Sequence, residues 1–175
     1  DSNYMIRFLK YNLVVFILLV SNQSQSQNIN GIINSYAQVT AIGTTTSTLS
    51  CGSGTAINTM TVVSSTGFAA DDTVLVIQMA GATINETQTI NFGKISAYNN
   101  SGNFELAIIQ SVSANVITFR NTLLKQYSPL SGFVQIVSLP NYDYATVTDN
   151  VFPQAWNGNT GGIVAIYVKN RLTLN

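Results

Sequence analysis

Histidine is absent from this sequence, and cysteine occurs once, at Cys51. Without histidine the chain lacks the commonest general base at neutral pH, and one cysteine can form neither an intrachain disulfide nor a cysteine–histidine metal site. Charged residues make up only 8% of the chain, 7 basic and 7 acidic. Because no basic run occurs, the sequence offers no electrostatic footprint for nucleic acid or an anionic membrane, and neither is expected as a partner.

Catalytic motifs are also missing. No Gly-x-Ser-x-Gly elbow, Ser-x-x-Lys motif or phosphate-binding loop occurs, so we expect no enzyme activity. The only adjacent carboxylates are Asp71 and Asp72, and we expect them to shape a turn. Since hard cations prefer oxygen ligands, the same pair is the candidate site for calcium, the one cofactor that the sequence suggests.

The first residues have the order of a secretion signal. Arg7 and Lys10 make the start positive, and residues 13–20 form an uninterrupted apolar run. This run is shorter than the roughly 20 residues that cross a bilayer, and polar residues follow it at once. Residues 1–4 precede Met5, the only plausible initiator in this region, and we interpret them as upstream translation rather than protein.

Small residues follow the apolar run at the spacing that a signal peptidase requires. Ser24 and Ser26 suit its minus three and minus one pockets, which predicts cleavage before Gln27. Residues 5–26 are therefore expected to be a signal peptide. The mature chain would carry no membrane span and would be secreted or held at the cell surface.

From Asn28 onward the residue choice favours strands, because Val, Ile, Thr, Tyr and Phe alternate with clusters of Gly, Asn, Asp and Ser. Residues 43–54 are rich in Thr, Ser and Gly and are expected to form a loop. Residues 73–79 are apolar on both faces, which predicts a central strand that is covered on two sides. The expected strands cover residues 36–42, 59–63, 73–79, 90–98, 104–112, 116–119 and 133–137.

The pattern predicts an all-β chain, a small antiparallel barrel or sandwich that leads into a further β region. Residues 27–58 would form an N-terminal strand and loop, residues 59–139 the β module, and residues 140–175 an aromatic loop and the start of the next region. Strands are expected over 163–168 and 172–174, around a turn at 169–171. Because the last strand has no terminating residue, we expect the natural protein to continue beyond it.

Large aromatic side chains gather after Pro140, at Tyr142, Tyr144, Phe152 and Trp156. Flat rings in a polar loop can stack on sugars while amides bond the hydroxyls, so Trp156 with Tyr142 or Tyr144 is a candidate ligand site. Alternatively, Trp156 plugs one end of the β core, which we favour because tryptophan is usually largely buried.

Three segments, residues 63–79, 108–119 and 153–165, together resemble the N-terminal region of large secreted or cell-surface proteins of Bacteroidota. These are adhesins and gliding-motility-associated proteins that leave by the type IX secretion system. The first segment of that family usually contains Gly-Phe-Ala-Ala-Gly-Asp, and here Asp71 replaces the second glycine. The resemblance covers residues 28–175 and implies type IX export and further domains downstream.

These features predict a non-catalytic structural or adhesive module of an exported cell-surface protein. Its partners would be surface glycans or other cell-surface proteins. Two alternatives stay open. One is a carbohydrate-binding module that uses the loop aromatics, and the other is the N-terminal part of a larger polysaccharide-active β-helix enzyme whose catalytic carboxylates lie downstream.

Overall fold

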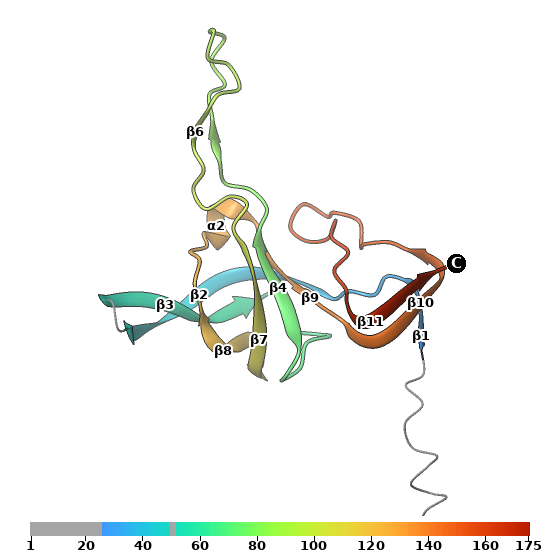
Figure 1. The fold of residues 1–175 in the computed structure, drawn as a ribbon. Coiled ribbons are helices and arrows are strands. Elements are labelled where there is room, and N and C mark those ends of the chain that lie inside the picture. The colour runs from blue at the N-terminus through green and yellow to red at the C-terminus, as the bar shows by residue number, and fades with distance from the viewer. Residues whose placement is uncertain (1–25, 50–51) are drawn as a thin grey trace, which may run out of the picture.

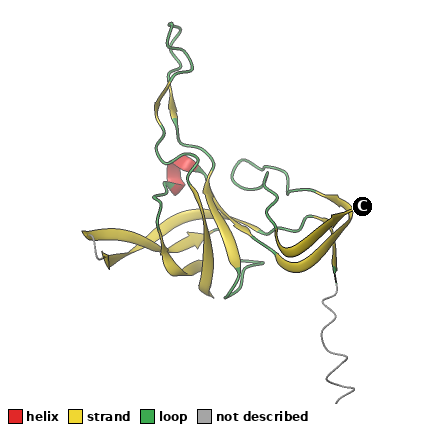
Figure 2. Ribbon diagram, viewed as in Figure 1, coloured by secondary structure: helices red, strands yellow, loops and turns green. Residues whose placement is uncertain are grey.

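A computed structural model describes residues 26–49 and 52–175 of the chain. Cys51, Ser24 and nearly all of the expected signal peptide lie outside these residues. Strands are the dominant secondary structure of the described part, and they form a closed barrel, a three-stranded sheet and a two-stranded ribbon (Figures 1 and 2). The prediction of an all-β chain, with an antiparallel barrel that leads into a further β region, is confirmed.

The barrel contains six strands, and every neighbouring pair is antiparallel. Because the barrel is closed, each strand has a hydrogen-bonded neighbour on both sides over at least part of its length. Small β proteins avoid edge-to-edge association in this way. In their order around the barrel the strands are β2 (Tyr36–Leu49), β3 (Gly52–Val62), β8 (Val116–Leu123), β7 (Phe104–Ser113), β4 (Thr73–Gln78) and β9 (Val134–Ser138).

Alternation along β4 shows how the barrel is filled. Val74, Val76 and Gln78 point inward and are buried, whereas the residues between them are half-buried. The strand is central, between β7 and β9, as predicted. The prediction that it is covered on two sides is wrong, since its outer face is only partly covered. The largest fully buried apolar side chains of the interior are Ile57, Met60, Ile109, Ile117 and Ile136, and the slightly more exposed Phe68, Phe119 and Tyr127 belong to the same core.

Residues 43–49 and 52–54 form paired strands of the β2–β3 hairpin, so the predicted loop over this stretch is wrong. Threonine is a strong strand former, and bulges at Val39/Ala41 and Gly43/Thr44 absorb the irregular register. Gly43 is needed for close approach rather than for a turn. A Cβ at this position would lie 2.0 Å from Thr59 Oγ1.

Residues 79–103, called the arm below, project from one end of the barrel (Figure 1). The arm contains β5 (Thr83–Ile84) and β6 (Ile95–Ala97), and α2 (Pro129–Gly132) lies at its base. The predicted strand over 90–98 is wrong for residues 90–94, which fold into a tip held by bonds such as Gly93 N–H to Asn85 O. The predicted turn before β7 is confirmed, with positive φ at Asn99, Asn100 and Gly102.

A parallel sheet joins β1 (Gln27–Gly31), β10 (Asn141–Val151) and β11 (Tyr167–Leu174), in that order. The whole barrel is therefore inserted between two neighbouring strands, β1 and β10. The prediction of two strands around a turn at 169–171 is wrong, because β11 is one strand with a register shift against β10 where the turn was expected. Residues 169–172 are all exposed, and Lys169 Nζ lies 3.9 Å from Asp143 Oδ1 of β10.

In the part of the chain that the structure describes, no helix combines the length and the apolar character needed to cross a bilayer.

Candidate functional site

The segment between β10 and β11, residues 152–166, crosses the outside of the barrel and is held there by buried polar side chains. Gln135 of β9 is fully buried, and its side-chain amide forms two hydrogen bonds with the backbone of Gly161 in the loop. Gln135 Nε2 donates to Gly161 O at 3.1 Å, and Gln135 Oε1 accepts from Gly161 N at 2.9 Å. Both polar groups of one loop residue are thus satisfied by one side chain of the barrel.

Two residues at the start of the barrel hold the same loop at other points. The Tyr36 hydroxyl donates to Ile163 O at 2.5 Å and accepts from Gln154 N at 3.3 Å. Burial raises the pKa of Tyr36, and the bond from the Gln154 backbone partly offsets this rise. Asn34 donates to Ala165 O at 2.6 Å and accepts from Ala165 N at 3.2 Å. The loop is therefore fixed at both ends and in its middle.

The turn inside this loop is also closed by its own bonds. Asn157 Oδ1 accepts from Asn159 N and Thr160 N, both at 2.9 Å, an Asx-turn arrangement. Gly162 N donates to Gln154 O at 2.8 Å. Gly161 has φ of +107°, and a Cβ there would lie 2.6 Å from Ala155 O, so only glycine fits. Residues 154–162 thus form a preorganised turn on the barrel surface.

Trp156 stands on this turn with 44% of its surface exposed. The expectation that Trp156 plugs one end of the β core is therefore wrong. The aromatic side chains Phe68 and Tyr127, from loops between the barrel strands, belong to the buried core, and Trp156 does not. Phe152, at the entrance of the same loop, is half exposed. The loop accordingly offers two exposed aromatic rings on a rigid backbone.

Tyr142 and Tyr144 lie on β10, in the parallel sheet, and not in the loop with Trp156. Both are half-buried, and they pair with Val168 and Arg171 of β11 across a bulge. The sequence grouped the three aromatics because they are close along the chain. In the structure Trp156 belongs to the crossing loop and the tyrosines to a strand.

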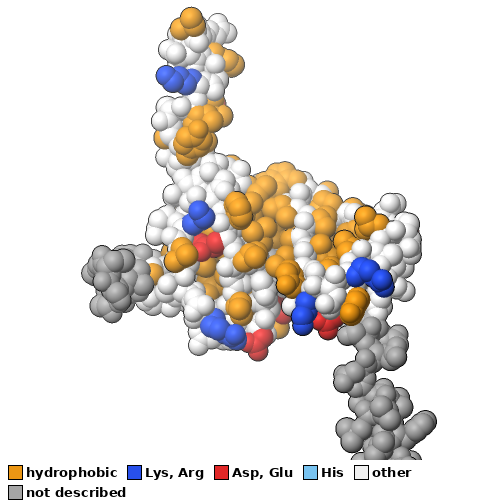
Figure 3. Space-filling view, in the orientation of Figure 1, with side chains coloured by type: hydrophobic (Ala, Val, Ile, Leu, Met, Phe, Trp, Pro, Cys, Tyr) orange, Lys and Arg blue, Asp and Glu red, His pale blue; other side chains and the backbone are white. Residues whose placement is uncertain are grey.

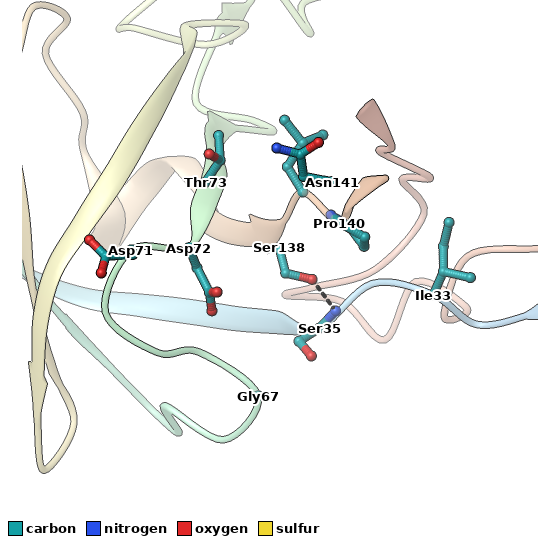
Figure 4. Close-up of a pocket in the computed structure, with 10 residues that line it drawn as sticks. Ile33, Ser35, Gly67, Asp71, Asp72, Thr73, Ser138, Pro140 and Asn141 are labelled. Carbon is teal, nitrogen blue, oxygen red and sulfur yellow. Dashed lines mark hydrogen bonds between the residues drawn. The ribbon is translucent and has the colours of Figure 1, made fainter. Parts of the chain in front are cut away.

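Asp71 and Asp72 form the turn before β4, as predicted, but their carboxylates diverge (Figure 4). Asp71 has φ of +72° and pairs with Arg120, and Asp72 Oδ2 accepts from Ala69 N at 2.7 Å. Among the described residues no group of three or more His, Cys, Asp and Glu side chains converges. This arrangement gives both carboxylates a structural role in the turn.

Asp72 borders a cleft of about 440 Å³ between the barrel and the parallel sheet (Figure 4). Its other polar lining residues are Asp71, Ser35, Thr73, Ser138 and Asn141, and Ile33, Leu139 and Pro140 add apolar surface. Ser138 Oγ, at the end of β9, accepts from Ser35 N at 2.8 Å and thereby holds the segment between β1 and β2 against the barrel at the cleft (Figure 4).

Two residues at the expected cleavage point lie in the described part of the chain. Gln27 is the first residue of β1, and Ser26 Oγ lies 2.8 Å from Thr146 Oγ1 of β10.

Comparison with known proteins identifies no relative. The sequence matches no known protein family and no curated protein. Three phage tailspikes show remote structural likeness, each at 12–13% identity. Pseudomonas phage LKA1 gp49 has a TM-score of 0.34 over 73% of this chain and 20% of its own, and Pseudomonas phage phi297 gp61 has 0.37 over 72% and 21%. Acinetobacter baumannii phage AP22 gp54, solved with a capsular saccharide, has 0.36 over 83% and 26%.

This chain thus spans about a fifth to a quarter of the length of those tailspikes. Similarity at this level says nothing about what the chain binds.

The residues that fix the loop, Gln135, Asn34 and Tyr36, were not singled out from the sequence. One signal was present, because Gln135 interrupts the apolar run of residues 133–137. A polar residue on a covered strand must have a partner, since burying it alone is costly. That reasoning would have marked Gln135, and Gln78 in β4, as organising residues.

Proposed function

We propose that this chain is a non-catalytic structural and adhesive module of an exported cell-surface protein. The observation that carries the proposal is the parallel order β1, β10 and β11 with the whole barrel inserted between the first two. In this arrangement the barrel is a domain that caps one end of the parallel sheet. Polar side chains of the barrel stabilise the junction between barrel and sheet, and the loops lie on the barrel surface.

The path from β10 to β11 supports a role in an elongated protein. Asn141 pairs with Tyr167 and Val147 with Leu174, so one circuit of chain takes about 26 residues. Parallel strands are usually connected through a helix, but here the connection is the irregular segment 152–166. Parallel strands joined by irregular circuits are the geometry of β-solenoids, in which successive strands stack along one axis. The sheet therefore suits a module on which an extended surface protein is built.

A pair of measurements tests this function. Protein that begins at Gln27, and so keeps every described strand, is incubated with panels of polysaccharides and peptides, and products are sought by mass spectrometry. Intact cells of the source organism are treated in parallel with a membrane-impermeant amine reagent. We expect no turnover, and labelling of the exposed side chains Lys94 and Lys169. Turnover, or protection of both lysines in intact cells, would overturn the proposal.

The preorganised turn favours glycan binding as a second function for the same module. Trp156 is held half exposed by a loop whose backbone is fixed before any ligand arrives, which lowers the entropic cost of stacking on a sugar. On a glycan array, Trp156→Ala is expected to weaken binding about tenfold or more, whereas Tyr98→Ala, on the distant arm, leaves it unchanged. Equal binding by both variants would refute this use of Trp156.

A further inference from the structure

The arm exposes more apolar side-chain surface than is usual for a loop that contacts only solvent. At its tip Ile90 is fully exposed and Phe92 is 67% exposed, and Ile84, Ile95 and Tyr98 follow toward the barrel. Figure 3 shows these hydrophobic side chains along the arm, with little charge between them. Contiguous exposed apolar surface of this kind marks an interaction site more often than a solvated one.

The tip is ordered by its own hydrogen bonds. Asn85 N donates to Lys94 O at 2.9 Å, Gly93 N to Asn85 O at 2.8 Å, and Phe92 N to Thr89 O at 3.0 Å. Asn85 Oδ1 accepts from Thr87 N at 2.9 Å. A loop with this many internal bonds presents its apolar side chains without first having to be ordered, as hot-spot residues of protein interfaces are presented.

The base of the arm is fixed to the barrel by the buried residue Gln78. Its Nε2 donates to Ala80 O at 2.8 Å and to Asn99 O at 2.9 Å, and its Oε1 accepts from Ser128 N at 2.8 Å. Ala80 N also donates to Gly132 O at 2.8 Å. These hydrogen bonds fix the position of the base of the arm relative to α2.

An apolar groove lies on the barrel next to α2, and hence near the base of the arm. It has a volume of about 340 Å³ and is lined by Ala41, Ile42, Pro129 and Leu130, together with three small hydroxyl side chains. Leu130 is 94% exposed at its rim. The same chain thus carries an apolar tip at one end of the arm and an apolar groove at the other.

We propose that a second copy of this chain occupies this surface, with the two arms side by side and antiparallel. A two-fold axis between the arms places the tip of one copy, with Ile90 and Phe92, in the groove of its partner. The same tip-to-groove contact therefore occurs twice in the dimer. The choice of a second copy follows from complementarity, because one chain carries both the exposed apolar tip and the apolar groove that receives it. A membrane fits the tip less well, because the arm carries one acidic and one basic side chain, Glu86 and Lys94, and no basic cluster.

Sedimentation equilibrium on protein that begins at Gln27 tests this two-fold dimer. We expect a dimer, and about hundredfold weaker association in the double variant Ile90→Asp/Phe92→Asp and in the groove variant Leu130→Asp. All three residues are exposed, so the circular dichroism spectra of the variants should match that of the parent protein. The control Leu174→Asp changes another largely exposed leucine, outside the arm and the groove, and should remain dimeric. A monomeric parent protein, or dimers that survive in both interface variants, would overturn the proposal.

Cysteine cross-linking tests the antiparallel arrangement separately. In a Cys51→Ser background, the variant Phe92→Cys/Leu130→Cys is expected to form disulfide-linked dimers on mild oxidation, whereas Phe92→Cys alone should not. Cross-linking of the single variant would mean that the tips meet each other and would refute the arrangement. Binding to phosphatidylcholine vesicles by monomeric protein, lost in the double Asp variant, would assign the tip to lipid instead. None of these outcomes depends on the export or adhesive role proposed above.

Discussion

Replacing Gln135 with leucine tests whether this residue organises the crossing loop. The two side chains are similar in size, so the barrel interior keeps its packing while both bonds to Gly161 are lost. Gly161 is itself buried, and each buried polar group left without a partner costs about 1–3 kcal/mol. For the two groups of Gly161 we therefore expect the free energy of unfolding to fall by about 2–6 kcal/mol.

Urea denaturation followed by circular dichroism measures this loss, and hydrogen exchange at the Gly161 amide reports whether the loop itself has loosened. Gln110→Ala is the matched control, because Gln110 is an exposed glutamine on a neighbouring part of the barrel. The control is expected to stay within about 0.5 kcal/mol of the parent protein. A loss below that value for Gln135→Leu, with unchanged exchange at Gly161, would refute the account of how the loop is held.

Two further predictions concern other parts of the barrel. Burial, followed by the hydrogen bond to Glu105 and the charge of Glu105, raises the pKa of Tyr127. The folded state therefore keeps a proton that the unfolded chain releases above about pH 10. The free energy of unfolding, measured against pH, should fall above that value, and it should fall less steeply in Tyr127→Phe. At the base of the arm, Gly132→Ala would place a Cβ 2.1 Å from the buried Gln78 Nε2, and thermal melts should show a destabilisation of about 1–3 kcal/mol that the exposed neighbour Ser131→Ala does not cause.

Local patterns in the sequence were sufficient for the fold class and for several turns. The turn from Asn99 to Asn103 and the central position of β4 follow from residue choice within a few positions, where conformational preference acts directly. The exported character and the family resemblance remain predictions, because the residues that suggest cleavage lie mostly outside the described part of the chain.

The failures share one cause, which is that pairing between strands decided the outcome. Residues 43–49 pair with residues 52–59 in the β2–β3 hairpin, although the composition of this stretch favours a loop. Residues 169–171 stay within β11 because β10 lies beside it and pairs with Val168 and Arg171. Likewise, the polar anchors of the loop acquire their role only when β9 and the segment 152–166 meet. No window of a few residues contains that information.

The most direct test of the central claim is mass spectrometry of the N-terminus of this protein recovered from its source organism. An exported surface module predicts a chain that begins at Gln27, the first residue of β1, in the cell-surface or secreted fraction. Peptides from residues 5–26 still attached to protein in the cytosol would contradict it.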